Sequence, residues 1–360
     1  MPDWRSTMTQ TFEYYVVDPD TWKDKTKLDC IKTSNISRDS DAETRGSATF
    51  DVTDVLGECY VRVYLITIQN GLRESHPLGT FLVQSPSSNF DGKTRSISID
   101  AYTPLLELKE KLPPIGYYLP KKSPDHPENG NIMDEAYRIV RENVRTPVVK
   151  VTCDKTLDND FVANVDDTWM SFTDDLIYKA KYEFDLDELG RILFAPIRDI
   201  ESTKPIWTYD DSNSSILYPE ISMDHDMYGI PNVVEVVYSK ANGEPIRVER
   251  VNDDPNSPVS IPRRGRRIVY RDTNPSLYGE PDEEQLGLYA DDLLKRLSTV
   301  EYTVSYTHGY CPVRVGDCVR IDYKKSGYSD VKAKVIRQTI NCKPGCPVAE
   351  TAVFTAKLWR

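Results

Sequence analysis

The sequence predicts a mainly β protein in which two small β-barrel-like domains flank a helix-containing α+β domain. Short segments rich in Val, Ile, Tyr and Thr alternate with polar turns at the start of the chain and return after Pro205. Apolar residues at helical spacing occur mainly between these two regions. With 360 residues, the chain has room for several domains of roughly 100 to 200 residues each. We therefore expect domains at residues 1–103, 104–204 and 205–360.

The first domain, residues 1–103, is predicted to be a small barrel or sandwich of short strands. Asn70 and Gly71 form the clearest hairpin signal in the chain. Residues 34–45 are polar and charged and have no apolar periodicity, so we expect an exposed loop there. The expected strands are 12–17, 47–52, 60–69, 80–84 and 96–101.

The middle domain, residues 104–204, is predicted to pack helices on a small sheet. Thr103 and Pro104 are typical of the N-cap and the first position of a short helix. Asn131 is placed to cap a second helix, and a third is expected to begin near Asp166. A hairpin follows, with strands at 182–186 and 191–194 and its turn at 187–190.

The last domain, residues 205–360, is predicted to be a second β domain with an inserted helix at 281–298. Pro281 suits the first position of that helix, acidic residues fill its first turn, and leucines form one apolar stripe. The domain is expected to end in an antiparallel meander at 301–360. The expected strands are 206–209, 230–238 and 246–251, and in the meander 318–323, 331–340 and 348–358.

Four cysteines, Cys311, Cys318, Cys342 and Cys346, lie at turns of this meander. The strand that begins at Cys318 runs away from them, and the next strand returns to deliver Cys342 and Cys346 to the same end. We therefore expect the four sulfurs to converge at one edge of the sheet. Four convergent thiolates are what an all-cysteine zinc site or an iron-sulfur cluster needs. The predicted ligands are these four residues.

Two other interpretations of the four cysteines stay open. Free cysteine behaves as a small buried hydrophobe, although polar turns are an unusual place for four of them. Two disulfides are a third interpretation if the protein works in an oxidising environment. The spacing is not that of a standard zinc ribbon. Cys30, Cys59 and Cys153 lie in unrelated segments, so we expect core or surface thiols there.

Other polar groups have a functional and a simpler interpretation. His308 lies three residues before Cys311 and is placed to shield or ligate the same site. Residues 224–226, an Asp-His-Asp run, suit a metal or a solvated loop, and we prefer the loop. The arginines of 263–267 suit phosphate or a subunit interface, and we prefer the interface. Helix capping and surface solvation explain a set of carboxylates more simply than a glycosidase pair does; these are Asp166, Asp167, Asp174, Asp175 and Asp185.

Composition and motifs exclude several function classes. A net charge of −12 argues against general nucleic-acid binding, which depends on neutralising phosphates. No run of 18 apolar residues encodes a membrane helix, and the N-terminus lacks the apolar core of a secretion signal, so we expect the protein to be made and kept in the cytoplasm unless it leaves inside a larger assembly. Nucleophile elbows, zinc-protease motifs, phosphate-binding loops and dinucleotide-binding glycine runs are absent. We predict that the protein is not an enzyme.

Several stretches, taken in their order, resemble the central baseplate hub or tail-hub proteins of tailed bacteriophages and phage-derived contractile particles. The resemblance covers most of the chain and includes the β, α+β, β order of domains. No stretch is a catalytic signature. The stretches are Leu78-Gly-Thr-Phe-Leu-Val, Ser96-Ile-Ser-Ile-Asp-Ala-Tyr-Thr-Pro-Leu, Gly229-Ile-Pro-Asn-Val-Val-Glu-Val and Arg314-Val-Gly-Asp-Cys-Val-Arg-Ile.

The resemblance implies a structural virion protein located in the tail baseplate. Hub proteins form homotrimers that join the tail tube or distal tail protein to the spike or tail-tip protein, and they line part of the tail channel. An acidic lumen would repel passing DNA. The four cysteines are also similar to the C-terminal set that holds a [4Fe-4S] cluster in tail-tip proteins of some flexible-tailed phages. The resemblance thus implies that Cys311, Cys318, Cys342 and Cys346 hold such a cluster, with zinc as the alternative, and that it stabilises the small meander.

A second function from another class remains an alternative. A cell-wall-degrading or glycan-binding tail component would act on peptidoglycan or sugar, and the sequence offers it only scattered carboxylates. A structural hub instead predicts a trimer without turnover.

Overall fold

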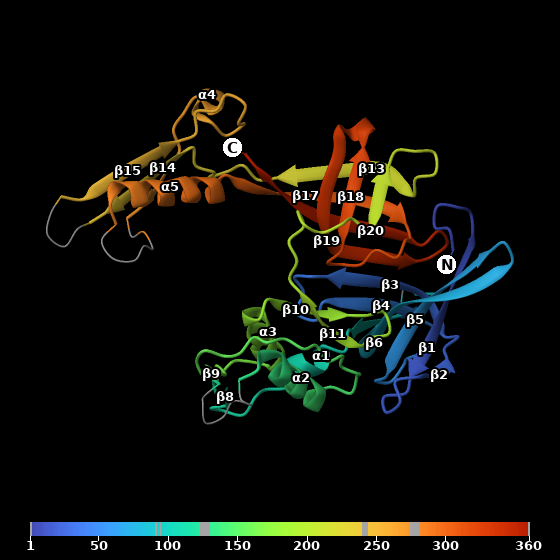
Figure 1. Ribbon diagram of the computed structural model, residues 1–360. Helices are drawn as coiled ribbons and strands as arrows, with labels where there is room; N and C mark the ends of the chain where they lie inside the picture. Colours follow the sequence, from blue (N-terminus) through green and yellow to red (C-terminus); the bar gives the residue numbers. More distant parts are fainter. Residues whose placement is uncertain are drawn as a thin grey trace. The chain divides into compact units, whose positions relative to one another are not determined.

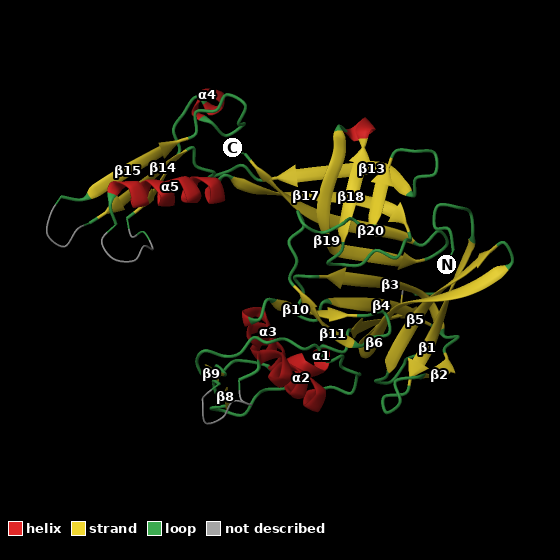
Figure 2. Cartoon of the chain, in the orientation of Figure 1, coloured by secondary structure: helices red, strands yellow, loops and turns green. Residues whose placement is uncertain are grey.

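The protein is mainly β, as predicted, and strands dominate the computed structural model in Figures 1 and 2. The structure describes residues 2–90, 92–93, 95–122, 130–239, 244–273, 275 and 281–358. The chain divides into two compact units, the first made of Met1–Ile221 and Tyr306–Ala352 and the second of Ser222–Ser305 and Val353–Arg360. These boundaries fall inside three strands, which are β13 (Leu217–His225), β17 (Thr299–Gly309) and β20 (Pro347–Lys357).

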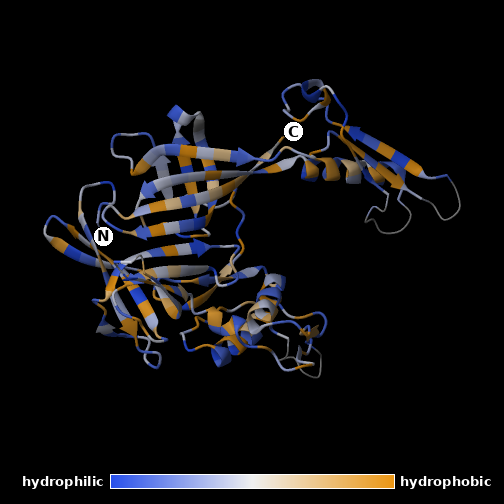
Figure 3. Ribbon diagram, turned by 180° about the vertical axis from the view of Figure 1, so that it is seen from behind, coloured by the Kyte–Doolittle hydropathy of each residue, from blue (hydrophilic) through white to orange (hydrophobic). Residues whose placement is uncertain are grey.

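Most strands of the first unit pair antiparallel, and hydrophilic and hydrophobic residues alternate along them, as Figure 3 shows. This alternation lets each strand present one face to a core and the other to polar surroundings. The predicted Asn70-Gly71 hairpin joins β5 to β6, with Gln69 directly opposite Leu72. The strands are β1 (Thr9–Val17), β2 (Asp24–Lys27), β3 (Ile31–Asp39), β4 (Gly46–Val52), β5 (Tyr60–Gln69), β6 (Leu72–Phe90), β7 (Arg95–Tyr102), β12 (Trp207–Asp210), β18 (Cys318–Tyr323) and β19 (Tyr328–Cys342), with the 3-10 turn η1 (Lys324–Ser326) between the last two.

The prediction of an exposed loop at 34–45 is wrong, because most of its first half belongs to β3. This strand pairs on one edge with β4 and on the other with β19, which comes 300 residues later in the sequence. Ile36 is fully buried and Ser34 nearly so. β3 thereby joins the N-terminal strands to the C-terminal strands in one continuous sheet. The described strands trace an open path, so closure into barrels stays a prediction.

The α+β module of the first unit follows β7 and packs around one apolar core. Asn131 caps α2 as predicted, because its side chain accepts a hydrogen bond from the Asp134 amide. A capping box between Thr168 and Ser171 begins α3, two residues later than expected. The module's elements are α1 (Leu106–Lys109), β8 (Tyr118–Leu119), α2 (Ile132–Asn143), β9 (Phe161–Val162), α3 (Trp169–Lys179) and the hairpin β10 (Tyr182–Leu186) and β11 (Ile192–Pro196).

The segment before β1 is anchored in a way that the sequence does not reveal. Trp4 is 8% exposed, and its ring lies 5.0 Å from the His76 ring and 5.1 Å from the Tyr310 ring. Arg5 donates to the Thr208 carbonyl at 3.0 Å on β12. The segment therefore ties β6 to the C-terminal strands of the same unit.

The second unit is a three-stranded sheet covered on one face by the predicted inserted helix. The capping box of Asp282 and Gln285 begins that helix, and its leucines pack on alternate valines of the central strand. On the other face, Glu235 lies between Arg247 and Arg271. The elements are β14 (Val233–Tyr238), β15 (Ile246–Val251), α4 (Ile261–Arg264), β16 (Val269–Asp272) and α5 (Glu283–Leu297).

The predicted domain boundaries at 103/104 and 204/205 stay a prediction, because the compact units divide the chain by another criterion. Among the described residues, no helix combines the length and the apolar character needed to cross a membrane.

Candidate functional site

The four predicted ligand cysteines all lie in the first unit, and all are buried. Cys311 follows β17, Cys318 begins β18, Cys342 ends β19, and Cys346 lies in the turn before β20. All seven cysteines of the chain fall in its described part and carry free thiols. The strands run in the predicted directions, but the register does not bring Cys318 to the others.

Cys318 is separated from the other cysteines because β19 extends well beyond the end of its partner β18. Cys318 lies opposite Lys334, whereas Cys342 lies opposite Ser34 on β3. The eight residues from Lys334 to Cys342 span about 26 Å at roughly 3.3 Å per residue. Burial raises the pKa of the Cys318 thiol, while Lys332 beside it lowers that pKa, so its neighbours are charged side chains.

The arrangement does not fit a four-thiolate group. Burial raises the pKa of Cys342 to about 12, with smaller opposing effects of Ser34 and Arg38, and burial also raises the pKa of Cys346. Without a metal both thiols are therefore protonated, but coordination deprotonates a thiol, so the position of Cys318 decides the fit. Among the described residues, no three His, Cys, Asp or Glu side chains are grouped so as to hold a metal ion. The four ligands, and with them the [4Fe-4S] cluster or zinc, stay a prediction.

A buried polar network surrounds His308, the residue that sequence analysis singled out beside Cys311. The His308 Nδ1 lies 2.7 Å from the Gly309 carbonyl oxygen, and Nε2 lies 3.3 Å from a Glu350 carboxylate oxygen. Two acceptors on one imidazole require both ring nitrogens to carry hydrogen. Burial lowers the pKa of His308, but hydrogen bonds with Cys311 and Glu350 outweigh it and raise the pKa to about 10. The ring is therefore an imidazolium paired with a carboxylate.

The network joins four strands of the first unit. Gln338 of β19 donates to Glu350 of β20 at 2.6 Å, and Tyr306 of β17 donates to the same carboxylate. The Tyr209 hydroxyl of β12 lies 3.0 Å from His308 Nε2. Burial raises the pKa values of Tyr209 and Tyr306, so both hydroxyls remain neutral. Tyr209 then accepts from the imidazolium and donates to the Cys311 sulfur at 3.5 Å. The sequence signal for this network is a polar residue at a position where the alternation of its strand predicts a buried side chain.

Cys311, His308 and Glu350 are a nucleophile, a base and an acid, but they are in no position to act on a substrate. Their exposed fractions are 1%, 0% and 2%, and the Cys311 sulfur lies 3.9 Å from the His308 Nδ1. A reacting group must come within about 3 Å of both the nucleophile and the base. The network therefore holds strands together, since a satisfied buried polar cluster specifies one packing arrangement.

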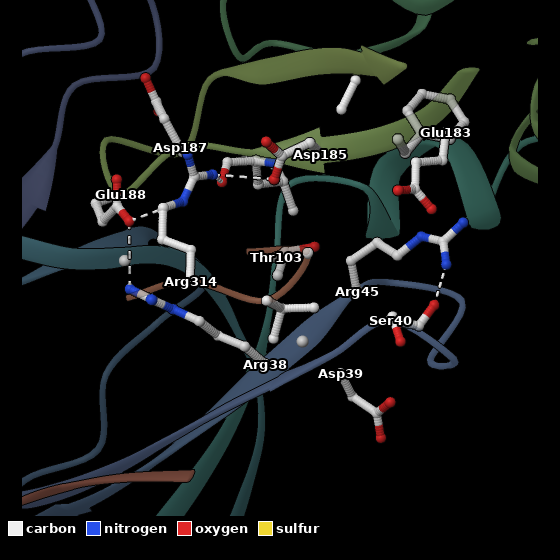
Figure 4. Close-up of a pocket in the computed structure, with 18 of the residues that line it drawn as sticks. Arg38, Asp39, Ser40, Arg45, Thr103, Glu183, Asp185, Asp187, Glu188 and Arg314 are labelled. Carbon is white, nitrogen blue, oxygen red and sulfur yellow. Dashed lines mark hydrogen bonds and ion pairs between the residues drawn. The ribbon is translucent and has the colours of Figure 1, made fainter. Parts of the chain in front are cut away.

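A pocket of about 290 Å³ in the same unit is lined by charged groups of both signs. It lies between the β10–β11 hairpin on one side and β3, β4, β6 and the loop before β18 on the other. Figure 4 shows its labelled charged residues, which come from both sides. The charged lining residues are Arg38, Arg45, Arg198, Arg314 and Lys334, and Asp39, Glu183, Asp185, Asp187, Glu188 and Asp317.

Arg314 is the central cation of this pocket. It contacts Asp185 at 2.9 Å and Glu188 at 3.1 Å, and Figure 4 shows both contacts. Arg38 also pairs with Glu188, at 3.6 Å, and donates to Gln338 at 3.3 Å, so the pocket is linked to the buried network. Burial raises the pKa of Asp185 more than Arg314 lowers it. The ion pairs therefore only partly compensate the loss of hydration.

The other predicted polar groups have local partners. His225 stacks on Tyr302 with ring centroids 4.5 Å apart, and Asp226 accepts from the Tyr228 amide at 2.7 Å. In the arginine loop, Arg264 donates to the Met227 carbonyl at 2.8 Å. The preferred loop at 224–226 is wrong for its first two residues, because Asp224 and His225 end strand β13. Arg263 and Arg264 belong to α4, and the subunit-interface role of 263–267 stays a prediction.

The fold is shared with solved tail proteins. A prophage tail protein from Shewanella oneidensis superposes with a TM-score of 0.62 at 10% identity, over 95% of this chain and 98% of that chain. A tail protein from Neisseria meningitidis superposes with a TM-score of 0.59, also at 10% identity, over 97% of this chain and 98% of that chain. The chain has the tail-protein fold. A scan of its sequence against protein-family models and a search of curated proteins both give no match.

In this tail-protein fold, three stretches on which the sequence resemblance rests meet at the pocket. They contribute Leu78 and Gly79 from β6, Thr103 from the strand-to-helix passage, and Arg314 and Gly316 from the loop before β18. Gly316 has a φ of +93°, which a side chain would strain. The resemblance therefore rests on residues that hold the modules of the first unit together.

Proposed function

We propose that the chain is a structural virion protein of a phage tail or a phage-derived particle, located in the tail baseplate. The observation that carries this proposal is the extent of the fold likeness, which covers 95% to 97% of this chain and 98% of each tail protein. A likeness of a single module would suit many functions, because folds are reused widely. A likeness over both units and every module suits a shared mechanical role.

We further propose that the protein is a homotrimeric hub that joins the tail tube or distal tail protein to the spike or tail-tip protein. Subunits of a closed ring meet through unlike surfaces, so one chain needs two separate contact regions. Two compact units supply such regions. The excess of 57 acidic over 45 basic residues also suits a channel through which DNA passes without binding.

The chemistry of the described residues supports a role without turnover. The Cys311, His308 and Glu350 side chains are buried in a strand-joining network, and the pocket carboxylates are engaged with arginine and lysine. Reactive groups at an enzyme site must reach their substrate.

Native mass spectrometry over a range of protein concentrations tests the hub. We expect a trimer of the 41.1 kDa chain. Antibody-gold labelling of purified particles should then mark the distal end of the tail, away from the capsid. A chain that stays monomeric at every concentration, or gold along the tail shaft, would contradict the hub. A peptidoglycan-release assay on the same preparation should show no activity.

A further inference from the structure

We propose that the pocket is an electrostatic latch. The α+β module, from α1 to β11, swings open along this pocket about a packed anchor elsewhere on its boundary, and ionic strength sets how often it opens. The proposal concerns motion inside the first unit and does not depend on the proposed function. We call the pocket side of the boundary the seam.

The anchor is formed by α1 and by the turn that follows β10. The Leu189 carbonyl accepts hydrogen bonds from Trp22 Nε1 at 2.8 Å and from Arg62 at 3.0 Å. Leu106 of α1 packs with Trp22 and Tyr60 in one apolar cluster. Apolar packing of this kind is not screened by salt. The anchor therefore holds at high ionic strength.

The polar contacts across the seam are of a different kind, because they are ion pairs together with one hydrogen bond from Arg314 to the Leu186 carbonyl. Arg314 pairs with Asp185 at 2.9 Å and with Glu188 at 3.1 Å, and Lys334 pairs with Glu183 at 3.6 Å. These five side chains retain exposed fractions of 22% to 31%. Partly exposed ion pairs are weak and are screened by salt. High ionic strength therefore weakens the seam and leaves the anchor unchanged.

The seam encloses a space that water can enter. Its pocket of about 290 Å³ is lined by charged groups of both signs and has room for several water molecules. Apolar side chains such as Phe81 and Phe184 line it as well, so opening hydrates both charged and apolar surface. Closure removes water from the Asp185 carboxylate, and burial raises its pKa despite the nearby Arg314. The ion pair therefore does not fully compensate the lost hydration, which favours opening.

The test is the labelling rate of a cysteine placed in the seam of the full chain. Ala195 of β11 lines the pocket opposite Glu183 and is partly exposed, so Ala195→Cys should react with a bulky maleimide slowly while the seam is closed and faster when it opens. Peptide mapping by mass spectrometry separates this cysteine from the native ones. We expect Arg314→Gln to raise the rate about two- to fivefold, the factor for losing a partly exposed ion pair. Salt at about 1 M should raise the rate of the parent to a similar extent and add less to Arg314→Gln.

Two controls make the outcome decisive. Arg191→Gln removes an ion pair with Asp187 that lies inside the hairpin turn and does not cross the seam, so it should leave the rate unchanged. Native Cys153 packs against the module's own core and reports unfolding of the module. If neither Arg314→Gln nor salt changes the labelling rate of Ala195→Cys, the latch is overturned. An equal effect of Arg191→Gln, or a parallel rise at Cys153, overturns it as well.

Discussion

Replacing Gly190 by alanine tests whether the hairpin turn is docked as tightly as the structure shows. Gly190 has a φ of +77°, and a Cβ added there would lie 2.7 Å from the Thr80 Cβ on β6. The positive φ costs an L-residue about 1 kcal/mol, and overpacking a tight site costs about 1 to 3 kcal/mol. We therefore expect Gly190→Ala to lower the free energy of unfolding by about 2 to 4 kcal/mol.

Gly71 provides a matched control, because its φ is +79° and its added Cβ would have nothing within 4 Å. Gly71→Ala should therefore cost only about 1 kcal/mol, the backbone contribution. Urea unfolding followed by tryptophan fluorescence measures the loss of unfolding free energy in each variant. Trp22 reports the turn directly, because it is hydrogen-bonded to Leu189 beside Gly190. Equal losses for the two variants would refute the close approach of the turn to β6. A larger loss for Gly71→Ala would refute it equally.

Three further substitutions test other parts of the first unit. Trp4→Ala should lower the free energy of unfolding by about 3 kcal/mol, because it removes a buried ring packed on Tyr310; an unchanged urea midpoint would show that the N-terminal segment is not anchored. Burial raises the pKa of Asp185, so the folded protein holds this proton more tightly than the unfolded chain, and the free energy of unfolding should fall as pH rises from about 3.8 through the raised value. Asp185→Asn should flatten that fall in denaturation curves recorded between pH 3 and pH 7. The predicted metal site can be tested by iron, sulfide and zinc analysis of protein purified without oxygen. Cys318→Ser should keep the metal content of the parent, whereas Cys342→Ser should lose any bound metal. Equal losses of metal in the two variants would show that all four cysteines are ligands despite the register.

Elements with strong local signals were predicted well from the sequence. Asn131 caps α2, and β15 has the bounds that its alternation predicted. The inserted helix begins with acidic residues and carries one apolar stripe, and it was found within two residues at each end. In each case the deciding interactions lie within about one turn or one hairpin, so the sequence around the element contains them.

Elements defined by distant partners were missed. β3 is polar because Ser, Asn and Thr fill much of it, and it is a strand because β4 and β19 supply hydrogen bonds on its two edges. The anchoring of Trp4 depends in the same way on His76 and Tyr310. The sequence of β3 by itself carries no signal of a partner 300 residues away.

The candidate site also combines features that the sequence predicted with features that only the tertiary structure decided. Local alternation predicted the directions of β18 and β19, and the order of short stretches indicated the tail-protein fold that the solved structures share. Strand direction places a residue at one end of a sheet, but register places it along the sheet, and register depends on the length and the partners of each strand. The extension of β19 onto β3 separates Cys318 from Cys342. The ion pairs of Arg314 with Asp185 and Glu188 likewise follow from packing of the hairpin against the sheet. Arg314 lies more than 120 positions from both carboxylates, so they interact only once the core has brought their backbones together.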